Sequence, residues 1–268
     1  MPELERDGIT FHWEERGEGQ PFIFQHGLGG DVSQPLGLFS PPPDIRLIAL
    51  DCRAHGQTHP VGDDTKINFA TFADDLAALL DELRVQQAVL GGISMGAAVA
   101  LTFALRYPAR VTALVLSRPA WMDAPNPFNV EAFAQIASLI RSHGAAAGKA
   151  AFEASRYLVE VKAESLDAAA SLLSQFDSQH AEDGVARLER IPKESPHPDR
   201  SVWNAVQVPV LILAVKGDPI HPCAYAEEMA AAFPDARLRD LTPKHVSADQ
   251  HAADTQRHIE QFFKEISC

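Results

Sequence analysis

The chain has 268 residues, 46% of them hydrophobic and 22% charged, and a formal net charge of −13 at pH 7. This composition is typical of a globular protein with a full hydrophobic core, and α/β folds of this length often form one unit. The excess of acidic residues argues against nucleic acid and anionic membrane surfaces as partners. No apolar run approaches the length of a membrane span, so we expect no membrane partner.

The cysteines and the first residues indicate the compartment. Cys52, Cys223 and Cys268 are scattered and have neither metal-ligand nor redox spacing. Such a sparse, odd set suits a reducing compartment. The charged stretch 1–6 lacks the apolar centre of a signal peptide. We therefore predict a cytoplasmic protein that needs no metal and no cofactor.

The first half of the chain contains several predicted strands and an amphipathic helix. A weak alternation over residues 3–16 predicts an opening antiparallel hairpin. Short apolar runs at 21–24 and 45–50 predict buried strands, and the apolar periodicity of 69–83 predicts an amphipathic helix. A further buried strand is expected at 111–116.

The second half begins with a different pattern. Residues 120–201 show helical periodicity only, in four stretches (129–142, 146–161, 164–176 and 180–190). Strands at 208–215 and 236–241 then alternate with helices at 224–233 and 248–266. Strands that alternate with helices predict an α/β fold with a mostly parallel sheet between two helical layers. We predict a core domain of residues 1–119 and 202–268 with a helical cap, or lid, of residues 120–201.

A G-x-S-x-G motif connects a strand to a helix in the middle of the chain. The apolar residues 88–90 lead into Gly92-Ile93-Ser94-Met95-Gly96, and a helix-forming segment, 97–106, follows. A serine on such a sharp turn exposes its hydroxyl above the sheet edge, and strand and helix approach so closely that small residues must flank it. Ser94 is therefore the candidate nucleophile.

Four segments together resemble the α/β-hydrolase fold family, in particular its small esterases and lactonases. They are Gly92–Gly96, the turn 25–30 (QHGLGG), the loop 51–58 (DCRAHGQT) and the loop 217–222 (GDPIHP). The resemblance covers roughly residues 20–118 and 206–264. It implies the α/β-hydrolase fold, a Ser-His-Asp triad and an insertion after the 111–116 strand.

Triad members in this fold follow the serine in the order acid, then histidine. Asp218 comes directly after the 208–215 strand, at the sheet edge where ligands bind, and is the predicted acid. Asp123 is the alternative. His245 follows the last strand by four residues and is the predicted base. His251 is its rival, because a capping box at Ser247 places it in the first turns of the last helix.

Backbone N–H groups complete the predicted chemistry. The resemblance assigns the oxyanion hole to the N–H groups of Leu28 and Met95. His26, Arg53 and His55 are expected to fix loops rather than to react. The remaining histidines are expected at the surface: His12, His59, His143, His180, His197, His221 and His258.

The cap should shape an apolar pocket for the substrate. The predicted substrate-binding residues are Trp121, Phe128 and Tyr157, from a wider set that also includes Met122, Phe152, Phe176 and Trp203. Each of these side chains has the alternative of belonging to the core of the cap itself. The predicted partner is a small apolar ester or lactone, and the protein is expected to be a monomer or a homodimer.

These predictions converge on a serine hydrolase that cleaves a small carboxylic ester or lactone through an acyl-enzyme intermediate. C–C bond hydrolysis, cofactor-free perhydrolysis and peptide-end cleavage use the same residues and stay open. A receptor that binds a small ligand without catalysis is the alternative from another class, since a fold by itself does not determine a function.

Overall fold

The computed structural model describes residues 4–266, so Cys268 and the first residue of the predicted hairpin lie outside it. Its centre is a seven-stranded sheet in the order β3-β5-β4-β6-β7-β8-β9, which is parallel except that β3 pairs with β5 antiparallel. The strands are β3 (Trp13–Arg16), β4 (Gln20–Gln25), β5 (Ile45–Leu50), β6 (Ala88–Ile93), β7 (Val111–Ser117), β8 (Val210–Val215) and β9 (Ala236–Leu241).

The opening of the chain differs from the predicted hairpin. Two short strands, β1 (Leu4–Arg6) and β2 (Ile9–Phe11), form a separate two-stranded sheet around a turn at Asp7 and Gly8, where φ is positive. β3 does not extend this hairpin. Its first residue, Trp13, is buried and pairs with Leu50, so burial of the indole on the main sheet determines the pairing.

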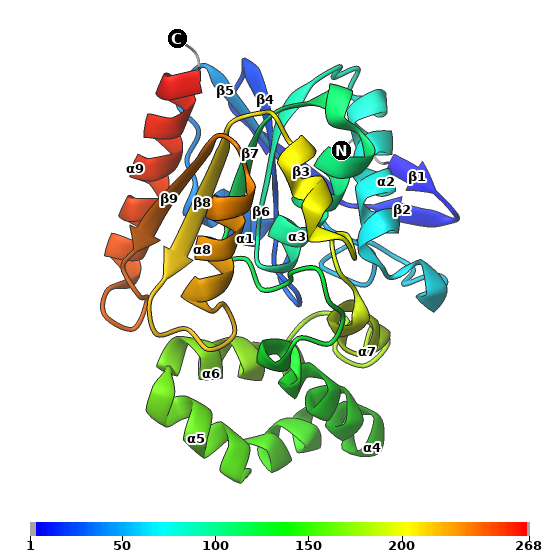
Figure 1. Ribbon diagram of the computed structural model, residues 1–268. Coiled ribbons are helices and arrows are strands. Elements are labelled where there is room, and N and C mark those ends of the chain that lie inside the picture. The colour runs from blue at the N-terminus through cyan, green and yellow to red at the C-terminus, as the bar shows by residue number, and fades with distance from the viewer. Residues whose placement is uncertain (1–3, 267–268) are drawn as a thin grey trace.

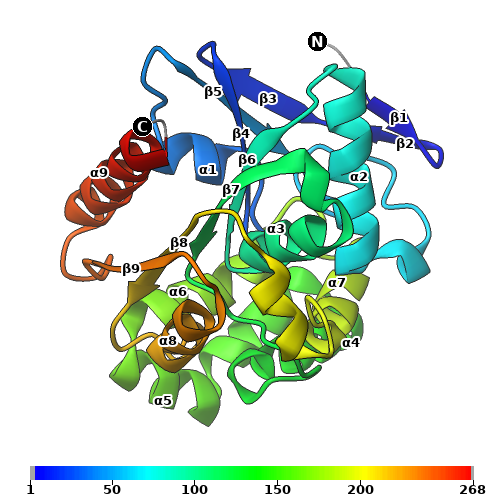
Figure 2. The ribbon, with the colours of Figure 1, turned by 45° about the horizontal axis from the view of Figure 1, so that its top comes forward.

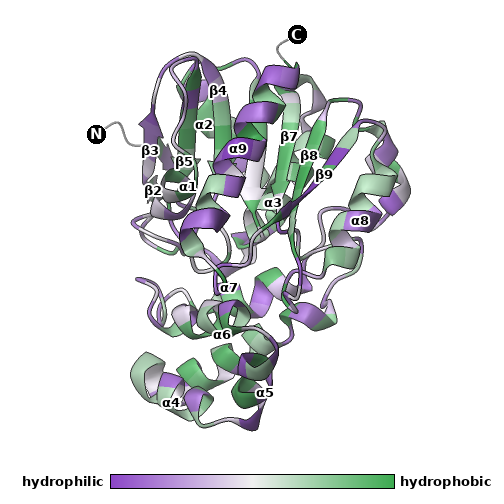
Figure 3. Ribbon diagram, turned by 90° about the vertical axis from the view of Figure 1, so that its left-hand side faces the viewer, coloured by the Kyte–Doolittle hydropathy of each residue, from purple (hydrophilic) through white to green (hydrophobic). Residues whose placement is uncertain are grey.

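Helices cover both faces of the sheet (Figures 1 and 2). On one face lie α1 (Ser33–Leu38) and α9 (Ala248–Ile266); the other carries α2 (Phe69–Glu82), α3 (Met95–Arg106) and α8 (Cys223–Ala232). All six residues of β6 are buried, as expected for a central strand between two layers. Figure 3 shows the contrast between the hydrophobic central strands and the hydrophilic residues on α9.

The chain between β7 and β8 contains helices and no strand. Figure 1 shows this segment beyond the carboxyl ends of the parallel strands. It comprises α4 (Ala132–Glu153), α5 (Arg156–Glu164), α6 (Leu166–Leu173) and α7 (Ala186–Arg190), with short 3-10 turns η3 (Phe128–Val130), η4 (Ser174–Phe176), η5 (Ile191–Lys193) and η6 (Arg200–Ala205). Two further turns lie outside this segment: η1 (Asp64–Lys66) precedes α2, and η2 (Pro108–Arg110) precedes β7.

The predicted fold class is confirmed, while some helix boundaries differ. The predicted break between 142 and 146 is a kink inside α4, where Gly144 has φ 76 and ψ 168. Glycine adopts this conformation without steric cost, so the helix resumes after it. The predicted helix 180–190 is regular only over Ala186–Arg190. Within residues 4–266, no helix combines the length and apolar character needed to cross a membrane.

Candidate active site

The turn between β6 and α3 has the close packing that its glycines predict. Ser94 lies between strand and helix with φ 57 and ψ −111, a conformation that residues other than glycine rarely adopt. A Cβ atom on Gly92 would lie 2.1 Å from the carbonyl carbon of Gly96, and one on Gly96 would lie 2.5 Å from the carbonyl oxygen of Gln25. Helix α3 therefore touches β6 at Gly92 and β4 at Gly96, and the turn holds Ser94 at the sheet edge.

His221 is the histidine next to Ser94. Its Nε2 lies 2.9 Å from the Ser94 hydroxyl oxygen, and its Nδ1 lies 2.8 Å from Oδ2 of Asp218. His221 and Asp218 are each 5% exposed. These are the contacts that a Ser-His-Asp triad makes, with acid and histidine three residues apart in one loop.

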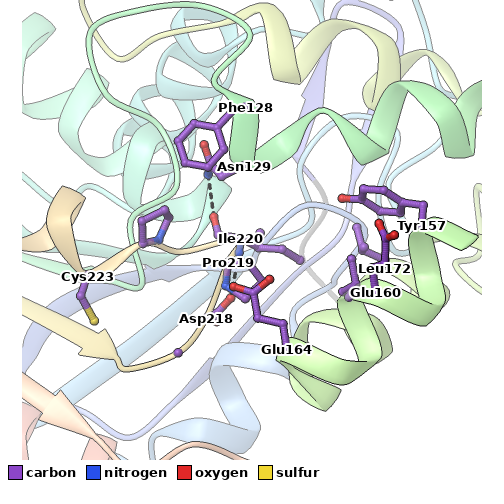
Figure 4. A pocket seen from close by; sticks show the side chains of 13 residues that line it. Phe128, Asn129, Tyr157, Glu160, Glu164, Leu172, Asp218, Pro219, Ile220 and Cys223 are labelled. Carbon is purple, nitrogen blue, oxygen red and sulfur yellow. Dashed lines mark hydrogen bonds between the residues drawn. The ribbon is translucent and has the colours of Figure 1, made fainter.

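The loop that carries both residues is fixed by its own backbone and by one side chain of the helical segment. Asp218 Oδ1 accepts the N–H groups of Ile220 and His221 at 3.1 and 3.2 Å. Pro219 and Pro222 restrict the backbone on either side. Asn129 in η3 donates from Nδ2 to the carbonyl oxygen of Ile220 at 2.6 Å (Figure 4).

Arg118 adds a positive charge to this group. It follows β7 and donates from Nη2 to Asp218 Oδ2 at 2.6 Å. Burial by itself raises the pKa of Asp218, but the charges and hydrogen bonds of His221 and Arg118 outweigh it and hold this pKa well below its usual range. Burial and then the Arg118 charge lower the pKa of His221. The structure therefore favours an ionised Asp218 and a neutral His221 at pH 7.

The two histidines predicted as bases bond elsewhere in the structure. His245 is exposed in the loop between β9 and α9, and its Nδ1 lies 3.2 Å from Oδ2 of Asp167 on α6. His251 is buried on α9 and its Nδ1 lies 2.8 Å from the carbonyl oxygen of Thr242. Sequence reasoning placed the base after the last strand, whereas the structure brings a histidine from the preceding strand's loop to Ser94.

The available signal for His221 was its position. It lies in the same strand-end loop as Asp218 and between two prolines, which restrict the backbone there. The expectation of a surface position is wrong for His221 and also for His180, which is 7% exposed. The alternative acid, Asp123, pairs with Arg200 at 2.8 Å.

The two backbone N–H groups predicted for the oxyanion hole lie at the ends of suitable segments. Met95 is the first residue of α3, so its N–H has no partner within the helix. Leu28 lies in the turn 27–30, which is closed by a hydrogen bond from Gly30 N–H to the Gly27 carbonyl at 3.0 Å. A Cβ on Gly27 would lie 3.5 Å from Cβ of Ser94, so this turn packs against the serine.

Of the residues expected to fix loops, His26 and His55 contact backbone groups and Arg53 forms an ion pair. His26 is fully buried; its Nε2 accepts the N–H of Cys52 at 3.0 Å and its Nδ1 lies 2.8 Å from the Gly27 carbonyl. Arg53 bonds both oxygens of Asp75 at 2.7 Å. The His55 Nδ1 lies 2.8 Å from the Arg53 carbonyl. His26 therefore connects the turn 27–30 to the loop after β5, and Arg53 connects that loop to α2.

A cavity of about 550 Å³ lies between the Asp218 loop and α5 (Figure 4). Phe128 and Tyr157 line it and are 73% and 39% exposed. Trp121 does not line it: it is 1% exposed, donates from Nε1 to the carbonyl of Ile191 at 3.1 Å and packs edge-on against Phe69. The hydrophobic effect and this hydrogen bond place Trp121 in the core instead.

The cavity has an apolar and an acidic side. Leu172, Val161 and Ile220 supply apolar surface, and Glu160 and Glu164 of α5 add carboxylates (Figure 4). Among residues 4–266, no group of three or more His, Cys, Asp or Glu side chains is arranged to hold a metal ion.

Comparison with known proteins identifies the family. The family model described as alpha/beta hydrolase fold matches residues 20–252. Proline iminopeptidase of Neisseria gonorrhoeae is 27% identical over 91% of this chain and 89% of that protein. A putative 2-succinyl-6-hydroxy-2,4-cyclohexadiene-1-carboxylate synthase of Bacillus subtilis is 34% identical, but the match spans only 41% of either protein.

Solved structures agree on the fold. The enol-lactonase from Burkholderia xenovorans LB400 superposes with a TM-score of 0.75 at 22% identity, covering 98% of this chain and 100% of that one. A thermophilic esterase from Thermogutta terrifontis gives 0.73 at 24% identity, covering 96% and 94%. The chain therefore belongs to the alpha/beta hydrolase fold family. It is an enzyme whose relatives and structural neighbours are hydrolases, such as an esterase, an enol-lactonase and a proline iminopeptidase.

Proposed function

We propose that the protein is a serine hydrolase that cleaves small carboxylic esters or lactones, with Ser94 as nucleophile and His221 as base. The observation that supports this most directly is a pair of contacts: His221 Nε2 lies 2.9 Å from Ser94 Oγ, and His221 Nδ1 lies 2.8 Å from Asp218 Oδ2. The proposal replaces His245 and His251 as the base, because their ring nitrogens bond to Asp167 and Thr242.

The reaction follows from this geometry. Nε2 of His221 removes the proton from the Ser94 hydroxyl as its oxygen attacks the substrate carbonyl. Asp218 Oδ2 accepts the Nδ1–H of His221 and stabilises the imidazolium that forms. The N–H groups of Leu28 and Met95 stabilise the oxyanion. The imidazolium then protonates the leaving alcohol, and a water molecule activated by His221 releases the acid from Ser94.

The cavity lies on the Asp218 side of the site, and neither Ser94 nor His221 is among its lining residues. It supports a small, largely apolar substrate without negative charge, part of which it would receive. Its lining combines apolar side chains with the carboxylates of Glu160 and Glu164, which would repel an anionic acyl group. The structural neighbours include proteins titled as an esterase and an enol-lactonase. We therefore propose neutral esters and lactones as substrates and expect slow turnover of esters of dicarboxylic acids. The helical segment 120–201 is proposed as the cap that bounds this cavity.

The same two carboxylates favour a second candidate, an aminopeptidase that releases an N-terminal residue. Glu160 and Glu164 lie on one face of α5, a turn apart, beside the Asp218 loop. Carboxylates placed there would bind a substrate ammonium group, and a matched relative is named as a proline iminopeptidase. Glu160 also pairs with Arg156 at 2.7 Å, and this pair would have to open.

The decisive experiment combines labelling and turnover in the full chain. A fluorophosphonate probe should modify Ser94 alone, and Ser94→Ala should abolish both labelling and hydrolysis of p-nitrophenyl acetate. His221→Ala should reduce kcat by at least about 100-fold, as expected for loss of a general base. A His221→Ala variant with normal kcat would refute the proposed base.

A substrate panel separates the two candidates. It should contain p-nitrophenyl esters of graded chain length, γ- and δ-lactones, and prolyl-p-nitroanilide. Glu160→Gln and Glu164→Gln should leave turnover of neutral esters nearly unchanged if the protein is an esterase. If the protein turned over the anilide faster than every ester, and the two variants lost this activity, it would be a peptidase instead.

A further inference from the structure

The Arg118 guanidinium lies against the acid and the base of the candidate site at once. Its Nη2 lies 2.6 Å from Asp218 Oδ2 and 3.1 Å from Nδ1 of His221. The Arg118 side chain is 10% exposed and that of Asp218 is 2% exposed. The chemistry of a Ser-His-Asp triad does not require a cation at this position, so Arg118 needs its own explanation.

Hydrogen-bond chemistry defines what Arg118 does to Asp218. A guanidinium has donors only, and an ionised carboxylate has acceptors only. Asp218 Oδ2 therefore receives Arg118 Nη2 and the Nδ1–H of His221, while Oδ1 receives the N–H groups of Ile220 and His221. With two donors on each oxygen, the carboxylate has one orientation in which all are satisfied. Among residues 4–266, removing Arg118 would leave the Nδ1–H of His221 as the one hydrogen-bond donor to Oδ2.

The backbone directs the arginine to this place. Arg118 has φ 52, and its N–H donates to the carbonyl of Leu213 in β8 at 2.7 Å. β8 is the strand whose end carries Asp218, and it pairs in parallel with β7. The bond across the two strands therefore sets the guanidinium beside the carboxylate although the two residues are 100 positions apart.

Two cations, in addition to the Asp218 carboxylate, act on the His221 ring. Asp218 favours the imidazolium, whereas Arg118 and Lys244, from the loop after β9, oppose it. Further out, Asp167 on α6 and His251 on α9 interact with Lys244 and Arg118. Burial disfavours the charged ring as well, and together with Arg118 it lowers the pKa of His221 despite Asp218.

We propose that Arg118 is a positioning residue that fixes the Asp218 carboxylate against His221 and sets a buried cation beside the Nδ1 edge of the imidazole. A cation at this place disfavours protonation of the ring. A neutral imidazole can accept the Ser94 proton, so the enzyme should keep its activity at a pH where most imidazoles are protonated. The catalytic consequence rests on the function proposed above, whereas the effect on the imidazole can be measured without turnover.

The first test is a proton NMR titration of the His221 ring in the full-length Ser94→Ala chain, with His221→Gln used to assign the signal. His221 should titrate below the ordinary histidine value of about 6.5. Adding Arg118→Met should raise the midpoint by about one pH unit or more, because a cation close to a buried ring is removed. Adding Arg118→Lys, which keeps the charge, should raise it less.

Two NMR results would overturn the inference. One is a His221 midpoint at or above 6.5 with Arg118 intact, a measurement that needs no Arg118 variant and therefore stands even if Arg118→Met fails to fold. The other is a folded Arg118→Met chain in which the midpoint does not move. Arg200→Met is the matched control, since Arg200 pairs with Asp123 and Glu228 near the surface and should leave the midpoint unchanged.

The second test is the pH dependence of kcat/KM for p-nitrophenyl acetate. Arg118→Met should move the acidic limb upward by the shift seen in the NMR titration and lower kcat about 10-fold at the optimum through loss of Asp218 orientation. KM should stay nearly constant. If kcat fell by the same factor at every pH and the acidic limb did not move, the role of Arg118 would be structural only and the inference would be overturned. If wild-type protein neither labels at Ser94 nor hydrolyses any ester, the proposed function fails while the NMR titration still decides the role of Arg118.

Discussion

The two halves of the candidate site are held in place by different forces. At the β6–α3 turn, Ser94 is positioned by steric contact, because Gly92 and Gly96 let strand and helix approach within van der Waals distance. In the 217–222 loop, Asp218 and His221 are positioned by polar contacts from Arg118, directly after β7, and from Asn129 in η3.

This difference predicts how each half responds to change. A steric turn has no titratable part, so it should be insensitive to pH and very sensitive to an added methyl group. A loop held by hydrogen bonds and charges should tolerate small changes of volume and respond to the loss of one donor or acceptor. The following predictions test this contrast, from the largest expected effect to the smallest.

Gly92→Ala should remove most folded, active protein. The new Cβ would lie 2.1 to 2.6 Å from backbone atoms of Gly96, and backbone cannot move aside as a flexible side chain can. We expect a loss of at least about 3 kcal/mol in the free energy of unfolding, measured by urea denaturation. Gly37→Ala is the control: Gly37 lies in α1 with nothing within 4 Å of its Cβ position, and alanine there should slightly stabilise the helix. Equal stability of the two variants would contradict the steric explanation.

Asp218→Asn should lower kcat on an activated ester by at least about 100-fold, because an amide has one acceptor oxygen where the carboxylate has two. Its NH2 group would face either the donors Arg118 and His221, which favours the wrong imidazole tautomer, or the two backbone N–H groups. Asp123→Asn serves as the matched control and should be nearly neutral, since Asp123 pairs with Arg200 and not with the histidine. The reverse ranking would move the acid to the segment after β7.

The same substitution should change how stability depends on pH. The folded-state pKa of Asp218 is depressed, so its contribution is present above the unfolded value of about 3.9 and is lost as the pH falls through the lower folded value. Wild-type protein should therefore lose stability below about pH 4 more steeply than Asp218→Asn. If the free energies of unfolding of the wild type and Asp218→Asn changed with pH in parallel, the pKa of Asp218 in the folded state would not be depressed.

Asn129→Leu should lower kcat about 10-fold and destabilise the fold by about 1 to 3 kcal/mol, because the buried carbonyls of Ile220 and Ala120 lose their donor. The pH profile of the remaining activity should keep its acidic limb, which distinguishes this tether from Arg118. Asn204→Leu, at an exposed position in η6, is the control and should leave kcat unchanged.

His245→Ala should change least. The ring is exposed, and its contact with Asp167 is a surface pair of the kind that contributes less than about 1 kcal/mol. We expect kcat within about twofold of wild type. His251→Ala should lower thermal stability rather than kcat, since it loses a buried bond to the Thr242 carbonyl. If either variant were inactive while His221→Ala turned over normally, the base would lie in the β9–α9 region after all.

The sequence alone determined the fold class and the turn that carries Ser94. Both depend on local patterns: apolar runs that alternate with amphipathic helices, and two glycines on either side of a serine. The extent of α9 and β9 agrees with the prediction for the same reason, because hydrophobic periodicity and capping act over a few neighbouring residues. Asp218 could be selected because a polar residue directly after a buried strand lies at the ligand-binding edge.

Only the tertiary structure decided which side chains meet. Arg118 and Asp218 come together because β7 and β8 are adjacent strands, a fact that spacing along the chain does not contain. Likewise, Trp121 lies in the core with a hydrogen bond to the Ile191 carbonyl, whereas Phe128 is exposed at the cavity. His221, His245 and His251 all follow the last two strands at distances open to a base. Their roles differ because each ring has a different partner: His221 lies next to Ser94, His245 next to Asp167, and His251 next to the Thr242 carbonyl.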